Sequence, residues 1–286
     1  MYKSIHVIMR KLFSVAADLF FSSNPVKINQ TCLNNYTQLV WESEHVGRKI
    51  KLHLFDRAER KYFMSTIKAG ATCIDVGANI GFYTNIFSYK AGVGGQVIAV
   101  EPIKRNCKLI ELNLEINKNK ARTSVECAAI ADVGDIDVEY SVCNDSAYSG
   151  VKLERKDDRE ITSALNENGE IRGYIHVHTL TIDGLATKYN LEKIDVLKIV
   201  VEGFVYKALL GARETLASPS MRPSIVMAKV VEQQLNYYGA TAKDIYTYME
   251  SFGYRKKTMT REGRLVDLAD LSIVESKPNV FFVAEN

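Results

Sequence analysis

A short glycine-rich segment combines a carboxylate with positions where no side chain blocks the backbone. Asp75 and Asn79 stand beside Gly77 and Gly81 in the sequence Asp-Val-Gly-Ala-Asn-Ile-Gly. Glycine lets a ligand approach the main chain closely and tolerates the positive φ angles of a tight turn. The first N–H groups of a helix that begins here lack partners within the helix and can bind a ligand. The segment therefore predicts a cofactor-binding turn.

A second carboxylate, Glu101, ends the next apolar run of the chain. A carboxylate at this place in an α/β unit can accept hydrogen bonds from the ribose hydroxyls of an adenosine-containing cofactor. NAD and S-adenosylmethionine both meet that condition. The glycine spacing differs from the G-x-G-x-x-G pattern of dinucleotide sites, and an acid at Asp75 suits a cationic amino-acid group better than a phosphate. We therefore expect S-adenosylmethionine, with a nicotinamide dehydrogenase as the weaker alternative.

The elements that must position these residues alternate between strand and helix from about residue 60 onward. Such alternation is typical of right-handed βαβ units in a doubly wound parallel sheet with helices on both faces. The last two predicted strands have no helix between them, so one of them is expected to run antiparallel at the sheet edge. Apolar runs predict strands at residues 72–76, 96–100, 124–129, 174–180, 194–201, 223–231, 254–259 and 279–284, and apolar spacing predicts helices at 80–90, about 107–117, 205–217 and 242–252.

Residues 1–59 predict an appendage to a main domain that covers residues 60–286. Apolar residues recur at helical spacing between Ile5 and Leu19, which indicates an amphipathic helix that packs on its own domain or forms a homo-oligomer contact. Three basic residues at its start leave attachment to a membrane surface as the weaker alternative. Asp18 interrupts the apolar run, so a signal peptide is not expected. Trp41 and the alternating Ile50, Leu52 and Leu54 predict a small β element, a candidate lid over the acceptor.

Composition excludes several classes of protein. Of the 286 residues, 47% are hydrophobic and 25% are charged, values close to those of globular domains and unlike those of disordered chains. The net charge of +3 gives no reason to expect nucleic-acid binding. No segment approaches the roughly 20 apolar residues of a transmembrane helix. The 5 cysteines lack paired spacing, which predicts reduced thiols and a cytoplasmic protein.

Six segments together resemble the FkbM family of methyltransferases. They follow one another in the family's order over about residues 70–232. The resemblance implies a class I (Rossmann-like) methyltransferase fold, S-adenosylmethionine as the donor, and O-methylation of a small-molecule or sugar hydroxyl. The segments are Cys73–Tyr83, Gly95–Pro102, Thr179–Asp183, Ile194–Gly203, Leu209–Ala212 and Pro223–Met227.

The chain departs from the family pattern where acids are usual. The family's Lys-Ile-Asp-Val-Glu-Gly-Ala-Glu becomes Lys198-Ile-Val-Val-Glu-Gly-Phe-Val here, with Val200 and Val205 in place of acids. Ala228 stands where the family tends to carry a glutamate. A positioned base contributes about 10²–10⁴-fold to proton transfer. These replacements predict either an apolar acceptor pocket that works mainly by proximity or reduced catalytic activity.

The predicted site has two groups of residues and no metal ligands. The leading hypothesis is an O-methyltransferase that acts on a small-molecule acceptor, and the alternative is a catalytically weakened cofactor-binding module that acts through partner contacts. Glu202 and Lys198 also have structural interpretations, as a helix cap and as a charge at the strand edge. The catalytic candidates are Glu202, Lys198 and Lys229, and the cofactor-binding candidates are Asp75, Gly77, Ala78, Asn79, Gly81, Phe82, Glu101, Pro102, Ala128 and Ala129.

Overall fold

The computed structural model describes residues 28–33, 36–41, 44–117, 120–152, 170–268 and 279–285. The predicted N-terminal helix, and with it the predicted oligomer contact, lies outside these residues. The strands are β1 (Ile28–Leu33), β2 (Tyr36–Trp41), β3 (Thr72–Val76), β4 (Gln96–Val100), β5 (Arg122–Glu126), β6 (Ala129–Ile130), β7 (Asp137–Cys143), β8 (Gly150–Val151), β9 (Ile171–Leu180), β10 (Val196–Ile199), β11 (Ile225–Lys229), β12 (Tyr254–Met259), β13 (Leu265–Asp267) and β14 (Asn279–Ala284). The helices are α2 (His45–Lys51), α3 (Arg57–Thr66), α4 (Phe82–Ala91), α5 (Lys104–Ile116), η1 (Ser146–Tyr148), α7 (Ile182–Lys188), α8 (Val205–Leu210), α9 (Arg213–Ala217), α10 (Glu232–Tyr237) and α11 (Ala242–Ser251).

The central sheet has the strand order β13-β12-β14-β11-β10-β3-β4-β5. Strands β11, β10, β3, β4 and β5 run parallel to one another, whereas β14 pairs antiparallel with both β11 and β12. The edge strand β13 also runs antiparallel to β12. The chain winds from β3 outward through β4 and β5, then returns to β10 on the other side of β3. This is the class I methyltransferase arrangement, and it places the switch point between β3 and β10, where such sheets bind ligands.

Successive side chains of a strand point to opposite faces of the sheet. Both faces of the central sheet are covered by helices, so its strands are buried on both sides. Ile74 and Val76 of β3 pack into one cluster with α7, α8, α9 and α11, whereas Cys73 packs into a second cluster with α3, α4 and α5. Leu197 of β10 belongs to the first cluster and Val196 to the second. Every residue of β3 is buried, as the uninterrupted apolar run predicts for a parallel strand.

The N-terminal part of the described chain packs against the second of these clusters. Leu33, Trp41 and Ile50 are fully buried there, together with Phe87 and Phe281. Strands β1 and β2 form a hairpin, but the stretch predicted as β around Ile50 is helix α2 with three exposed residues after it. Helix α2, about two turns long, buries Ile50 without any alternation, which explains the wrong prediction. The division of the chain into domains at residue 59 stays a prediction.

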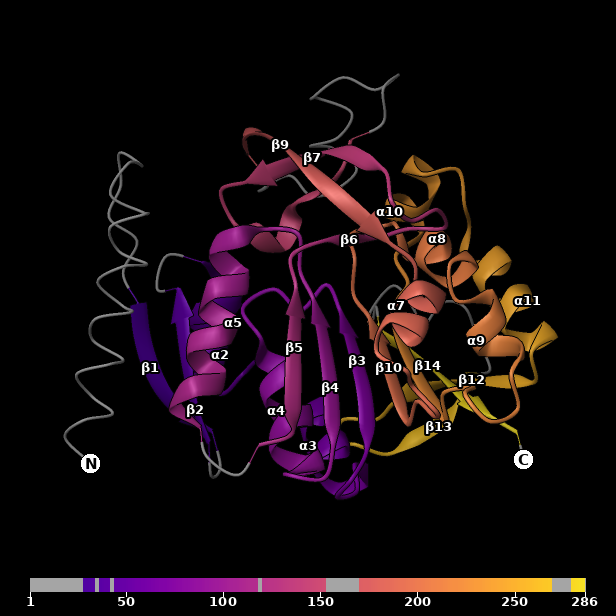
Figure 1. The fold of residues 1–286 in the computed structure, drawn as a ribbon, viewed down its shortest axis with the longest axis horizontal. Coiled ribbons are helices and arrows are strands. Elements are labelled where there is room, and N and C mark those ends of the chain that lie inside the picture. Colours follow the sequence, from indigo (N-terminus) through magenta and orange to yellow (C-terminus); the bar gives the residue numbers. More distant parts are fainter. Residues whose placement is uncertain are drawn as a thin grey trace.

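A small sheet of order β6-β9-β7-β8 lies over the carboxyl end of the central sheet (Figure 1). The arrowheads of β3, β4 and β5 point toward it in that view. Strand β7 was not predicted, although Asp-Val-Glu-Tyr-Ser-Val-Cys alternates polar and apolar residues as a half-buried strand does. The predicted helix 205–217 is divided into α8 and α9 at Gly211, where a Cβ atom would lie 2.1 Å from the Ala131 carbonyl oxygen.

Two further observations concern membrane-spanning helices and the cysteines. In the described part of the chain, every helix is too short or too polar to cross a bilayer. Cys107 and Cys127 form a disulfide with Cα atoms 6.1 Å apart, whereas Cys32, Cys73 and Cys143 are free. The expectation of reduced thiols is therefore wrong for the first two. The sequence offers no spacing signal for this pair, because α5 and the end of β5 bring the two sulfur atoms together.

Candidate active site

A cavity of about 330 Å³ opens at the carboxyl ends of β3, β4 and β10. Its volume falls at the lower end of the range of small-molecule sites. One side is formed by residues proposed from the sequence to hold a cofactor, namely Gly77, Ala78, Asn79, Phe82, Glu101, Pro102, Ala128 and Ala129. The remaining lining residues, called the acceptor side below, come from α2, the loop before α3, α4, the small sheet with η1, and the ends of β10 and β11. They include Val46, Phe55, Asp56, Tyr83, Tyr140, Tyr148, Lys198, Val200, Glu202, Phe204 and Lys229.

The turn after β3 is shaped by glycine and asparagine in the left-handed region of the backbone. Gly77 has a φ of 69°, and a Cβ atom there would lie 2.0 Å from the Val200 carbonyl oxygen. Asn79 has a φ of 50°, a conformation that asparagine tolerates better than most residues. Gly81 does not line the cavity; its φ is 80° and a Cβ atom would lie 3.0 Å from Ile110. Gly81 therefore serves the close packing of α4 against α5.

Glu101 lies at the end of β4 with only 4% of its surface exposed. Its Oε2 atom accepts a hydrogen bond from the Asn79 backbone N–H at 2.9 Å, and its Oε1 atom accepts from the Ile103 N–H and the Asn106 side chain, both at 3.1 Å. Burial is the main reason that the pKa of Glu101 rises to about 7, while these donors oppose the rise. Each carboxylate oxygen has more than one lone pair, so the group retains capacity to accept ligand hydroxyls from the cavity.

The acid of the turn is paired with a lysine of the neighbouring strand. Asp75 is fully buried and does not line the cavity. Its Oδ1 atom lies 2.9 Å from the Lys198 ammonium nitrogen, and its Oδ2 atom accepts a hydrogen bond from the Thr84 hydroxyl at 2.6 Å. The structure therefore places Asp75 behind the cavity wall, paired with Lys198, whereas contact with a cofactor stays a prediction. The register of β3 and β10, which sets Asp75 opposite Lys198, explains this pairing.

The ammonium group of Lys198 binds the backbone of the cofactor-binding turn. Besides Asp75, its Nζ atom donates to the Gly77 carbonyl oxygen at 2.8 Å and to the Val76 carbonyl oxygen at 3.2 Å. An ammonium group has three donors, and all three are engaged. Although Lys198 lines the cavity, the structural interpretation of this residue therefore fits better than a catalytic one.

Glu202 and Lys229 form an ion pair on the acceptor side of the cavity. The Lys229 ammonium nitrogen lies 2.6 Å from Glu202 Oε1, and the Gln234 side chain donates to Glu202 Oε2 at 2.5 Å. The side chain of Glu202 is 8% exposed and that of Lys229 is 21% exposed. These two of the three predicted catalytic candidates thus meet at one wall of the cavity, where the charge of each offsets that of the other.

The three positions where family acids are replaced are not equivalent. Val200 lines the cavity, whereas Val205 and Ala228 are fully buried in the hydrophobic cluster behind it. The expectation that all three border the site is therefore wrong for Val205 and Ala228. Aliphatic side chains suit those two places, because an unpaired carboxylate in an apolar cluster is strongly destabilising.

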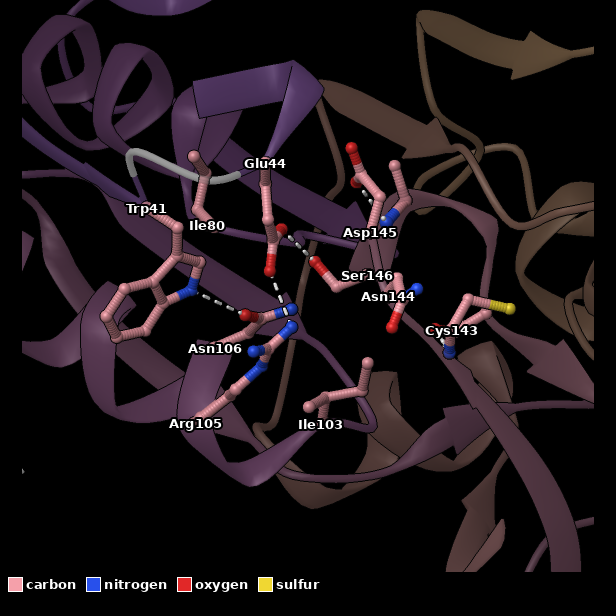
Figure 2. A network of polar contacts seen from close by, with 12 residues as sticks. Trp41, Glu44, Ile80, Ile103, Arg105, Asn106, Cys143, Asn144, Asp145 and Ser146 are labelled. Carbon is pink, nitrogen blue, oxygen red and sulfur yellow. Dashed lines mark hydrogen bonds and ion pairs between the residues drawn. The ribbon is translucent and has the colours of Figure 1, made fainter. Parts of the chain in front are cut away.

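A polar network beside the cavity was not predicted from the sequence (Figure 2). Glu44, which precedes α2, is 1% exposed; its Oε1 atom lies 2.5 Å from Arg105 of α5, and its Oε2 atom accepts from the Ser146 hydroxyl at 2.6 Å. Burial raises the pKa of Glu44, and Arg105 opposes that rise. Ser146 also accepts from the Asn79 side chain at 3.2 Å. The network therefore ties three segments far apart in the chain to the cofactor-binding turn.

Asp56, which precedes α3, also lies in the cavity, and sequence reasoning did not single it out. It is an isolated acid between Phe55 and Arg57, and no spacing pattern marks it as functional. The histidines of β9 lie elsewhere: His178 contacts Asp135 and Asp137 on an exposed face. No three His, Cys, Asp or Glu side chains gather into a candidate metal site within the residues that the structure describes.

Comparison with known proteins gives one family match. The model of the methyltransferase FkbM domain matches residues 75–256. That interval begins at the cofactor-binding turn and ends in β12, so it contains both sides of the cavity apart from the part contributed by α2, the loop before α3 and β14. No curated protein sequence shows a significant match.

Several solved structures are similar to this chain at low sequence identity. A TehB-like SAM-dependent methyltransferase from Corynebacterium glutamicum has a TM-score of 0.43 and 11% identity, over 83% of this chain and 93% of that one. An O-methyltransferase from Bacillus cereus in complex with SAH has a TM-score of 0.41 and 12% identity, over 80% and 81%. A SAM-dependent methyltransferase from Agrobacterium tumefaciens has a TM-score of 0.43 and 10% identity, over 92% and 72%.

Proposed function

Because the chain belongs to the FkbM methyltransferase family, whose methyl donor is S-adenosylmethionine, we propose that it methylates a hydroxyl group of a small molecule or sugar. The observation that carries this proposal is the place of Glu101. Its buried carboxylate lines the cavity at the end of β4, beside the turn of Gly77 and at the switch point of the sheet. An adenosine ribose in this type of sheet is held by a carboxylate at that place.

The donor side of the cavity suits S-adenosylmethionine. Glu101 retains a lone pair on Oε2 for a ribose hydroxyl, and the small side chains of Ala128 and Ala129 leave room for a flat adenine ring. Gly77 keeps the backbone open where a larger side chain would collide with Val200. When bound, the donor supplies an electrophilic methyl group on a sulfonium. The chain's own residues bind the nucleoside, fix the turn through Lys198 and exclude water.

The acceptor side combines aromatic walls with few free charges. Phe55, Phe204 and Tyr148 line it, and Glu202 and Lys229 form an ion pair there. Methyl transfer needs the acceptor oxygen about 3–3.5 Å from the methyl carbon and in line with the bond that breaks. Aromatic walls can hold a sugar or another ring in that position. These features support a small neutral or weakly polar acceptor rather than a nucleic acid.

Two measurements test the proposal. Isothermal titration calorimetry with S-adenosylhomocysteine is expected to show binding to the wild-type protein and clearly weaker binding to Glu101→Gln. Transfer of a radioactive methyl group from S-adenosylmethionine is then measured with a panel of sugars, polyols and phenols, and the methylated product is identified by mass spectrometry. Absence of nucleoside binding would refute the proposal. Binding without transfer to any acceptor would favour the alternative, a weakened module that acts through partner contacts.

Other aspects of the function rest on the sequence alone. The expected cytoplasmic location and a homo-oligomer through the N-terminal helix stay predictions. Size-exclusion chromatography with light scattering tests the last of these when the full chain is compared with a variant that carries charged residues at Ile8 and Leu12.

A further inference from the structure

Asp56 presents a carboxylate to the cavity from outside the segments that resemble the family. It stands before α3 with a φ of 39°, in the left-handed region. Aspartate and asparagine adopt this region more readily than other residues apart from glycine. The Tyr83 hydroxyl donates a hydrogen bond to Asp56 Oδ2 at 2.6 Å, which fixes the direction of the carboxylate.

Charged and titratable groups face Asp56 from four elements. Tyr83 comes from α4, Glu59 from α3, Lys198 from β10 and Lys229 from β11. Both lysines already have carboxylate partners, because Lys198 pairs with Asp75 and Lys229 with Glu202. Within the described residues, Asp56 forms no ion pair, and its Oδ1 atom accepts no hydrogen bond. That oxygen is therefore available to a ligand.

The other carboxylates of the cavity are less suited to take a proton from an acceptor. Glu202 is offset by Lys229 and Gln234, and Glu101 stands on the donor side. Val200 replaces the family acid that would border the acceptor. If the chain methylates a hydroxyl, as proposed above, we infer that Asp56 is the general base that accepts the hydroxyl proton. This role rests on the proposed function. In it, an acid from the N-terminal part of the chain takes the place of the acid that the family motif lacks here.

The proton transfer accompanies one bond exchange. The acceptor oxygen forms its bond to the methyl carbon, and the carbon–sulfur bond breaks with its electron pair left on sulfur. The hydroxyl proton moves to Asp56 Oδ1 and leaves to water after product release. Burial is the largest cause that raises the pKa of Asp56 to about 6, so the group is ionised at neutral pH and still basic enough to act.

The first test does not need the acceptor. In sinefungin, a carbon that bears an ammonium group replaces the methylated sulfonium, so the analogue carries a positive charge where S-adenosylhomocysteine carries none. A base that touches the acceptor oxygen lies close to that charge. We expect Asp56→Asn to lower the preference for sinefungin over S-adenosylhomocysteine by about fivefold or more at pH 8. Asparagine tolerates the left-handed backbone at this position, so the variant is expected to fold.

Glu59→Gln is the matched control, because it removes the same charge from the same helix at a residue that does not line the cavity. We expect it to keep the wild-type preference. With any acceptor that the wild-type protein methylates, Asp56→Asn is expected to lower kcat by about 10²–10⁴-fold. The acidic limb near pH 6 is expected to disappear from its pH profile, while any contribution of Glu101 near pH 7 remains.

The outcomes separate this inference from the proposed function. If wild type binds both nucleosides and Asp56→Asn keeps the wild-type preference, the role of Asp56 is overturned while the methyltransferase proposal stands. If wild type binds neither nucleoside, both fail. A loss of preference in Asp56→Asn that Glu59→Gln does not share supports the inference. An equal loss in the two variants shows a general effect of charge and contradicts it.

Discussion

Replacing Lys198 with methionine leaves a buried carboxylate without its positive partner. The two charged atoms lie 2.9 Å apart, and the side chains of Lys198 and Asp75 are 3% and 0% exposed. Breaking a buried pair by removing one partner costs about 3–5 kcal/mol. Methionine keeps most of the volume of the lysine stem, so the free energy of unfolding should fall by about this amount through the charge and not through a cavity.

The assay is urea unfolding followed by fluorescence and circular dichroism. Lys257→Met is the control, because its ion pair with Asp267 lies at the surface, with side chains 25% and 73% exposed. Exposed pairs contribute about 0–1 kcal/mol, and the control is expected to stay in that range. The double variant Asp75→Asn, Lys198→Met removes both charges but keeps an acceptor for the Thr84 hydroxyl. It is expected to recover about 1–3 kcal/mol relative to Lys198→Met.

Lys198→Met should also loosen the cofactor-binding turn, because the lysine holds the carbonyl oxygens of Val76 and Gly77. We expect the affinity for S-adenosylhomocysteine to fall about tenfold, which corresponds to about 1.4 kcal/mol. A cost below about 1 kcal/mol in the unfolding experiment would refute the reasoning, since a surface pair alone would account for it. A double variant less stable than Lys198→Met would refute the assignment of the cost to the unpaired Asp75.

Three further predictions concern the cavity. In urea unfolding, Gly77→Ala should lower the free energy of unfolding by at least about 3 kcal/mol more than Gly92→Ala does. Both glycines have positive φ, but a Cβ atom at Gly77 would also collide with the Val200 carbonyl oxygen. Equal losses in the two variants would contradict this prediction. Because the pKa of Glu101 is raised in the folded state, ionisation of this group destabilises the folded protein. The free energy of unfolding of wild type should therefore fall by up to about 3 kcal/mol relative to that of Glu101→Gln as the pH rises from about 4.5 to 7. An equal pH dependence of the two proteins across that range would refute this prediction. Val200→Asp should not raise the methylation rate if Asp56 already supplies the base, and a gain of about tenfold or more would show that the missing family acid limits the rate.

The parallel part of the fold follows from local patterns in the sequence. Apolar runs such as residues 72–76 and 96–100 are short and bounded by glycine or a charge, and β3 and β4 occupy these runs. Helix α11 begins where Thr241 and Asp244 form a reciprocal capping box, a signal that lies within four residues. Signals of this range depend only on residues that are close together in the sequence. That is why strand and helix order could be predicted without knowledge of tertiary contacts.

The roles of charged residues could not be predicted in the same way. The type of Asp75 fits a cofactor contact, but its role depends on Lys198, which the sheet register brings beside it from a distant part of the sequence. Likewise, Val205 and Ala228 stand next to residues that line the cavity, Phe204 and Lys229, although both are buried behind it. Sequence spacing says which elements carry a residue. The direction of the side chain depends on packing that spacing does not encode.

The cavity therefore has two sides with different origins in the chain. The donor side is built from consecutive βα turns whose carboxyl ends meet at β3 and β4, so its geometry follows from the parallel sheet itself. The acceptor side takes Val46, Phe55 and Asp56 from the N-terminal part of the chain, which packs on the same hydrophobic cluster as α4 through Trp41 and Ile50. Phe55 packs edge-to-face on Phe82 of the donor side, with ring centroids 5.0 Å apart, so a change at Phe55 is expected to affect both sides. A change at Val46 should alter the choice of acceptor while the affinity for the donor stays near that of wild type. Coupling between the two sides is expected through the Glu44 and Ser146 network, since Ser146 contacts Asn79 of the donor side directly.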